Sequence, residues 1–142
     1  MTKKYNALIL EIDEVVEEAV VLLVEGVTVK CFASYCPFAI EAGKQYAVEF
    51  DLVLPDSDGV MLAQGSDRKA EMTDLGFSCF VSGYLDGPIL RSFVDFMNLE
   101  LHYGFPQFNE KYVKVSVERI DVAFGQERRN FWARSSEVSF NS

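Results

Sequence analysis

The chain has one histidine, His102, and because histidine is the residue type most often used as a general base, it is the first candidate for that role. It lies beside Tyr103 and Gly104, and no Ser-His-Asp or Cys-His series can be proposed around it. A general base needs partners that orient it and exchange protons with it. We therefore expect His102 to be structural or solvent-facing, and the sequence predicts a protein that is not an enzyme.

The three cysteines, Cys31, Cys36 and Cys79, could join His102 as ligands of a structural zinc ion, because zinc takes thiolate and imidazole ligands. Their spacing matches no zinc ribbon or finger. An odd number of cysteines also argues against a secreted disulfide framework. Cys31 and Cys79 fall in strand-like segments and are expected to be small buried thiols. No metal and no cofactor is predicted.

Carboxylates are numerous, and two of them at a defined separation are what a glycosidase requires. Asp51, Asp86, Asp95 and Asp121 all fall in strand-like segments, where solvated side chains are the simplest expectation. Spacing along the chain does not measure the separation between two carboxylates. A carboxylate-based hydrolase therefore stays open as an alternative.

Acidic residues crowd the chain between Glu11 and Glu25, in a protein whose formal net charge is -9. Such a surface repels nucleic-acid phosphates and anionic lipid, and it attracts basic proteins through long-range steering. The alternative is a solvated face that aids solubility. The candidate binding residues of this group are Glu11, Asp13, Glu14, Glu17 and Glu18.

A second candidate contact zone lies near the C-terminus, where Arg128, Arg129 and Arg134 surround Trp132. Arginine and tryptophan together suit stacking on bases or anchoring in a protein groove, where these two residue types dominate the binding energy. The alternative is a tail that folds Trp132 onto an edge of its own sheet.

Period-two alternation of apolar and polar residues is the dominant pattern and predicts a mainly β protein. In the first strand we expect Leu8, Leu10 and Ile12 to form the apolar face, and a phase shift after it indicates a β-bulge or coil near Val15. An X-Gly pair, Glu25-Gly26, predicts a tight hairpin. The expected strands are Tyr5 to Asp13, Ala19 to Val24, Val27 to Phe32, Tyr46 to Leu54, Phe77 to Leu85 and Tyr112 to Phe124.

The remaining segments carry weaker patterns. Residues 60–75 are expected to be a long mid-chain loop, with one helical turn as an alternative. Ile89 to Leu101 fits a strand or a helix, and its β-branched and aromatic residues favour a strand. A phase jump inside the last strand predicts a bulge near Glu118-Arg119. A chain of 142 residues fits a single domain, which we place at residues 1–124, followed by a polar C-terminal tail at 125–142.

A long, phase-shifted first strand, a hairpin and a third long strand entered through Gly43-Lys44 are similar to the opening half of an OB-fold. The resemblance covers about the first 54 residues and implies a small antiparallel OB-like β-barrel. OB-folds commonly bind oligonucleotides or oligosaccharides, and Tyr46 and Phe50 would then offer a stacking platform. However, alternation places these rings on the face that the core would cover, and Glu49 and Asp51 disfavour nucleic acid.

Together these patterns predict a non-catalytic module that binds another macromolecule, a protein of basic character in the first instance. An immunity-type or antitoxin-like protein is one concrete version, because a compact acidic domain suits the neutralisation of a basic nuclease or pore-forming toxin. The alternative is an OB-type module for nucleic acid or oligosaccharide. No apolar stretch is long enough to span a bilayer, so we expect a cytoplasmic protein with no membrane contact.

Overall fold

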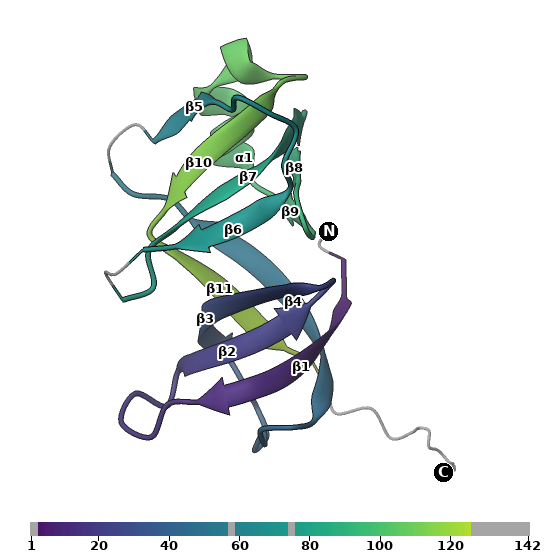
Figure 1. Ribbon diagram of the computed structural model, residues 1–142, viewed down its shortest axis with the longest axis vertical. Coiled ribbons are helices and arrows are strands. Elements are labelled where there is room, and N and C mark those ends of the chain that lie inside the picture. The colour runs from purple at the N-terminus through teal and green to yellow at the C-terminus, as the bar shows by residue number, and fades with distance from the viewer. Residues whose placement is uncertain (1–2, 57–58, 74–75, 126–142) are drawn as a thin grey trace.

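The computed structural model describes residues 3–56, 59–73 and 76–125 and shows a mainly β protein, as predicted (Figure 1). Its strands form two sheets. The helical segments of the described part of the chain are α1 (Leu99–Gly104) and the short 3-10 helix η1 (Pro106–Phe108). The predicted tail, with Arg128, Arg129, Trp132 and Arg134, lies outside the described residues.

The first sheet is closed, because each of its five strands pairs with two neighbours in the order β1-β2-β3-β11-β4 and β4 returns to β1. All of these pairs are antiparallel except β3 and β11, which run parallel. The expected purely antiparallel arrangement is wrong at this pair. A long intervening chain joins the two strands, so no hairpin constrains their direction. The strands of this closed sheet are β1 (Tyr5–Ile12), β2 (Ala19–Val24), β3 (Val27–Tyr35), β4 (Gln45–Val53) and β11 (Arg119–Phe124).

Alternation predicts the inward face of β4 correctly but not that of β1. Phe50 is only 2% exposed, inside the closed sheet. In β1, Ala7 and Ile9 are fully buried, whereas Leu10 is 43% exposed. The expected apolar face with Leu8, Leu10 and Ile12 is therefore wrong. Leu10 faces outward in alternation with Ile9, and the register of β1 against β2 then shifts between Ile9 and Glu11, which indicates a bulge at Leu10.

The hairpin between β2 and β3 is confirmed. Glu25 and Gly26 both have positive φ, 49° and 78°. A two-residue type I′ turn requires positive φ at both positions, which is why an X-Gly pair identifies it. β2 itself has the bounds predicted for it, Ala19–Val24.

The second sheet is open and is inserted between β4 and β11, whose residues Val53 and Arg119 pair directly. Figure 1 shows it stacked above the closed sheet, with β4 and β11 leading to and from it. Its order is β5-β10-β7-β8-β9, with β6 also paired to β7. Its strands are β5 (Val60–Leu62), β6 (Lys69–Met72), β7 (Cys79–Asp86), β8 (Ile89–Arg91), β9 (Asp95–Met97) and β10 (Tyr112–Val117).

This second sheet corrects three expectations. The supposed loop at 60–75 contains β5 and β6, which are too short for alternation to reveal them. The segment from Ile89 to Leu101 holds two short strands and the start of α1. The expected strand from Tyr112 to Phe124 is two strands, β10 and β11, in different sheets. The phase jump near Glu118 is thus the passage between sheets and not a bulge. The barrel was expected to take up residues 1–124, whereas the closed sheet uses only part of them.

The two sheets share one continuous core. Phe50 of β4 packs against Phe96 of β9, with ring centroids 6.4 Å apart. The Asp95 backbone N–H donates to the Tyr5 hydroxyl at 2.8 Å. Lys3 Nζ also lies 2.8 Å from an Asp95 carboxylate oxygen. These contacts fix the inserted sheet against the N-terminal strand.

Candidate functional site

The predicted acidic residues gather at one end of the first hairpin. Glu11 is exposed one residue before the end of β1, and the connection to β2 carries Asp13, Glu14, Glu17 and Glu18, all exposed. Glu25 is not part of this group, because it lies at the far end of β2, about 20 Å away at 3.3 Å per residue. We call residues 13–18 the acidic loop.

The acidic loop has an ordered backbone and an apolar tip. One Asp13 carboxylate oxygen, Oδ1, accepts hydrogen bonds from the backbone N–H groups of Val15 and Val16, both at 2.8 Å. These two bonds hold the pKa of Asp13 below its usual value. Val15 is 89% exposed. In the sequence, Val15 and Val16 were interpreted only as the position of the phase shift. An apolar pair between carboxylates in a turn could also have indicated the exposed apolar tip.

A second surface lies on the outer side of β3, where two aromatic rings meet. Phe32 and Phe77 make an edge-to-face contact with ring centroids 5.6 Å apart. The guanidinium of Arg119 lies 4.5 Å from the Phe32 ring, and Lys30 Nζ lies 5.1 Å from the Phe77 ring. Both distances are within the range of cation–π attraction. Alternation alone did not bring Phe77 to β3, because Phe77 lies in the turn that precedes β7, a strand of the other sheet.

The expected stacking platform on β4 is not exposed. Phe50 faces the core, and Tyr46 packs between Phe38 and Phe124 with centroid distances of 5.7 and 5.8 Å. The Tyr46 hydroxyl accepts a hydrogen bond from the Glu41 backbone N–H at 3.0 Å. These side chains therefore stabilise the closed sheet.

The three cysteines and His102 differ in burial and position. Cys31 and Cys79 are buried, as expected, and Cys36 is exposed. Burial raises the pKa of the Cys31 thiol far above its ordinary value and that of Cys79 to about 11, so neither is a ready nucleophile. His102 lies on α1 against Tyr103, with ring centroids 4.8 Å apart. Within residues 3–56, 59–73 and 76–125, no three His, Cys, Asp or Glu residues are grouped to hold a metal ion.

Most of the carboxylates singled out on strands are engaged by cations. Arg91 bonds to both Asp86 and Asp95, at 2.8 and 3.1 Å. Arg119 Nε donates to Asp121 at 2.7 Å. Asp51 pairs in register with Asp121 across β4 and β11. Partial burial raises the pKa of Asp51, and the neighbouring Asp121 and Glu49 raise it further.

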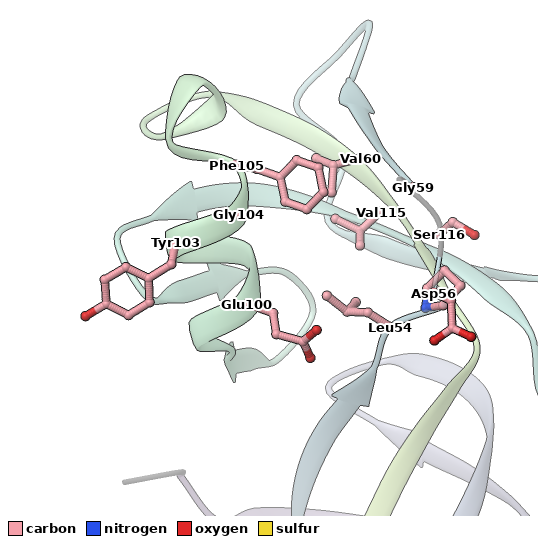
Figure 2. A pocket seen from close by; sticks show the side chains of 11 residues that line it. Leu54, Asp56, Gly59, Val60, Glu100, Tyr103, Gly104, Phe105, Val115 and Ser116 are labelled. Carbon is pink, nitrogen blue, oxygen red and sulfur yellow. The ribbon is translucent and has the colours of Figure 1, made fainter.

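A cavity of about 460 Å³ lies between α1, β10 and the connection from β4 to β5, and sequence reasoning missed it (Figure 2). Three stretches far apart in the chain supply its walls, so no local pattern could reveal it. They are the connection from β4 into β5, α1 with the residue that follows it, and β10. The lining residues are Leu54, Pro55, Asp56, Gly59, Val60, Glu100, Tyr103, Gly104, Phe105, Val115 and Ser116.

One wall of the cavity depends on a glycine. A Cβ atom on Gly59 would lie 2.8 Å from Cβ of Ser116, closer than such atoms approach. The Ser116 backbone N–H donates to the Gly59 carbonyl at 2.6 Å. This close approach explains why the chain enters β5 through a glycine.

The family comparison is informative once this geometry is known. A family model described as "Uncharacterised conserved protein UCP019853" matches residues 3–125. The chain belongs to this family. No curated protein matches the chain, and no solved structure does.

The UCP019853 match spans both sheets, the acidic loop and the cavity. The predicted residues Arg128, Arg129, Trp132 and Arg134 lie beyond it as well as outside the described residues. No helix in the described part of this family member is long and apolar enough to cross a membrane.

Proposed function

We propose that the protein is a non-catalytic binding module whose ligand is a basic protein, contacted through the acidic loop. The observation that carries the proposal is Val15, 89% exposed among four neighbouring carboxylates. An apolar centre with a charged rim is the usual anatomy of a protein interface. The two hydrogen bonds that Asp13 accepts order the loop before binding, which reduces the entropy lost on association.

The charge of the molecule defines the chemistry of the partner. A net charge of -9 steers a cationic protein toward the loop and raises the association rate at low salt. The partner surface should carry lysine or arginine around an apolar recess that accepts Val15. Basic nucleases and pore-forming toxins have this character, so an immunity-type or antitoxin-like role is the specific form of the proposal.

The test is affinity capture from nuclease-treated lysate at low salt with three forms of the protein. One variant removes loop charge by Glu14→Gln, Glu17→Gln and Glu18→Gln. The control removes the same charge elsewhere by Glu41→Gln, Glu110→Gln and Glu118→Gln, all exposed. We expect one basic protein to be retained by the wild type and the control and lost from the loop variant. Equal retention by both variants would exclude the acidic loop as the contact.

We also propose, as a second candidate, an OB-like barrel that binds an oligonucleotide or oligosaccharide. Two features support it: the five-stranded order of the closed sheet, and the cationic and aromatic side chains on β3. OB-folds bind ligands on the face of strands 2 and 3 and on the connection between strands 4 and 5. Here Lys30 and Phe32 belong to the third strand, and Phe77 belongs to that connection.

Fluorescence anisotropy with labelled single-stranded DNA and with labelled oligosaccharides tests the second candidate. Stacking on an aromatic ring contributes about 1–3 kcal/mol per base, so Phe77→Ala should weaken binding at least about fivefold. Tyr35→Ala, an exposed aromatic substitution at the end of β3, is the control. Absence of binding to every probe at low salt would reject this candidate.

A further inference from the structure

The cavity beside α1 and β10 has the size and floor of a small-molecule site. Its volume of about 460 Å³ falls within the range of roughly 300–1,000 Å³ that ligand pockets occupy. Figure 2 shows the side chains of Leu54, Val60, Phe105 and Val115 gathered at its centre. An apolar body of a few carbon atoms would displace water from this floor, with a favourable free energy for each buried methylene group.

The charged groups of this cavity are all of one sign. Asp56 and Glu100 are its ionisable carboxylates, and its described lining includes no lysine, arginine or histidine. Neither carboxylate has an ion-pair or hydrogen-bond partner among the described residues. Glu100 extends from α1 toward Leu54, on the side of the cavity where Asp56 lies (Figure 2). A ligand placed here meets an apolar wall and an uncompensated negative charge.

We propose that this cavity binds a free aliphatic amine, a function separate from protein binding by the acidic loop. The hydrocarbon chain lies on Leu54, Val60, Phe105 and Val115. The ammonium group faces Asp56 and Glu100, since it has three donors and carboxylates are acceptors only. A divalent metal ion fits less well, because hard cations need six or more oxygen ligands and the rest of this wall is apolar.

The first experiment compares three probes of equal chain length by ¹H–¹⁵N NMR titration at pH 7. The probes are n-hexylamine, 1-hexanol and hexanoate, which carry positive, no and negative charge. We expect saturable shifts from n-hexylamine at the amides of Val60, Glu100 and Phe105. 1-Hexanol should bind at least about threefold more weakly, and hexanoate more weakly still. Equal binding of the three probes would overturn the proposal.

Variants then locate the charge and the floor. Asp56→Asn with Glu100→Gln should weaken n-hexylamine about threefold to tenfold and leave 1-hexanol unchanged. Val60→Phe should weaken both probes by filling the cavity. Leu99→Ala is the matched control, because that side chain lies on α1, is 57% exposed and is not among the residues that line the cavity.

The control for non-specific cation binding is the acidic loop. Its charge-removed form, Glu14→Gln, Glu17→Gln and Glu18→Gln, should bind n-hexylamine as the wild type does. Amine-induced shifts that map to residues 13–18, or unchanged affinity in the Asp56 and Glu100 double variant, would overturn the proposal. The NMR spectrum of each variant without ligand shows whether that variant is folded. If Val60→Phe is unfolded, the double variant Asp56→Asn with Glu100→Gln decides the outcome.

Discussion

At the scale of single residues, Asp51 is a carboxylate that opposes folding. It stands directly across from Asp121, and like charges in register on neighbouring strands repel each other. Its pKa is raised, first by partial burial and then by Asp121 and Glu49. A raised pKa means that the folded protein disfavours the charged form. The penalty is absent below the unfolded pKa of about 3.9, grows as pH rises from that value to the folded pKa, and is fully present above it.

Replacing Asp51 by asparagine should therefore stabilise the protein at neutral pH only. We expect Asp51→Asn to raise the free energy of unfolding by about 0.5 kcal/mol at pH 7 and to change it little at pH 3. Urea unfolding followed by circular dichroism at both pH values measures the difference. Glu118→Gln, on an exposed position, is the control and should show no such pH dependence. Stabilisation of the same size at pH 3 would disprove the electrostatic cause.

Gly83 allows β7 to approach the segment that follows β8. A Cβ atom on Gly83 would lie 2.5 Å from the Arg91 carbonyl oxygen, which is backbone and cannot rotate away. Next to it, the buried Ser92 hydroxyl donates to the Ser82 carbonyl at 2.6 Å. A side chain at position 83 would separate both contacts.

We expect Gly83→Ala to lower the free energy of unfolding by about 2 kcal/mol, as overpacking of a closed contact does. Gly65→Ala is the matched control, because no atom lies within 4 Å of its Cβ position, and it should be nearly neutral. Both are compared by urea denaturation. Equal stabilities of the two variants would mean that the strands move apart at no cost.

At the scale of elements, α1 depends on the residue before it. Asn98 is its N-cap, and the side-chain oxygen accepts a hydrogen bond from the Leu101 backbone N–H at 3.0 Å. The same side chain donates from Nδ2 to the Leu52 carbonyl at 3.4 Å, which links the helix to β4. A helix of six residues is too short to be stable by itself, so these end contacts matter.

Asn98→Ala should lower the free energy of unfolding by about 1 kcal/mol, the usual contribution of an N-cap. Asn98→Asp keeps the acceptor for Leu101 and should recover most of this loss. Urea denaturation of both variants makes the comparison. If Asn98→Asp is as destabilised as Asn98→Ala, then the bond to Leu52 and not the cap holds the helix.

At the scale of the whole molecule, the two sheets should unfold together. Phe96 of β9 is fully buried and packs against Phe50 of the closed sheet. The core is continuous across this contact, and the chain enters and leaves the inserted sheet at the paired residues Val53 and Arg119. Loss of the inserted sheet would expose the adjoining part of the closed sheet.

We expect Phe96→Ala to lower the free energy of unfolding by about 3–4 kcal/mol. Native-state hydrogen exchange should show that loss both at Val81, in the inserted sheet, and at Ile120, in the closed sheet. Leu99→Ala, at a position 57% exposed, is the control and should alter neither amide by more than about 0.5 kcal/mol. Reduced protection at Val81 alone would show that the sheets unfold independently.

Local patterns in the sequence determined what depends on neighbouring residues. Alternation and the Glu25-Gly26 turn were sufficient to predict a mainly β chain and the bounds of β2. Strand periodicity and turn conformation are both set within a few residues. The acidic loop was also readable, since charged side chains in a turn remain exposed. The inward face of β1 was not readable, because both faces of this strand carry apolar residues and packing in the closed sheet selected Ala7 and Ile9.

Only the tertiary structure decided which strands share a sheet and which distant residues come together in the aromatic contact and the cavity. In the sequence, β10 and β11 look like one interrupted strand, because each of them alternates regularly. Alternation does not indicate which sheet a strand joins. Phe32 contacts Phe77, and Leu54 and Val115 line the same cavity, because segments distant in the chain pack together. Such contacts depend on the path of the whole backbone, which period-two patterning does not specify.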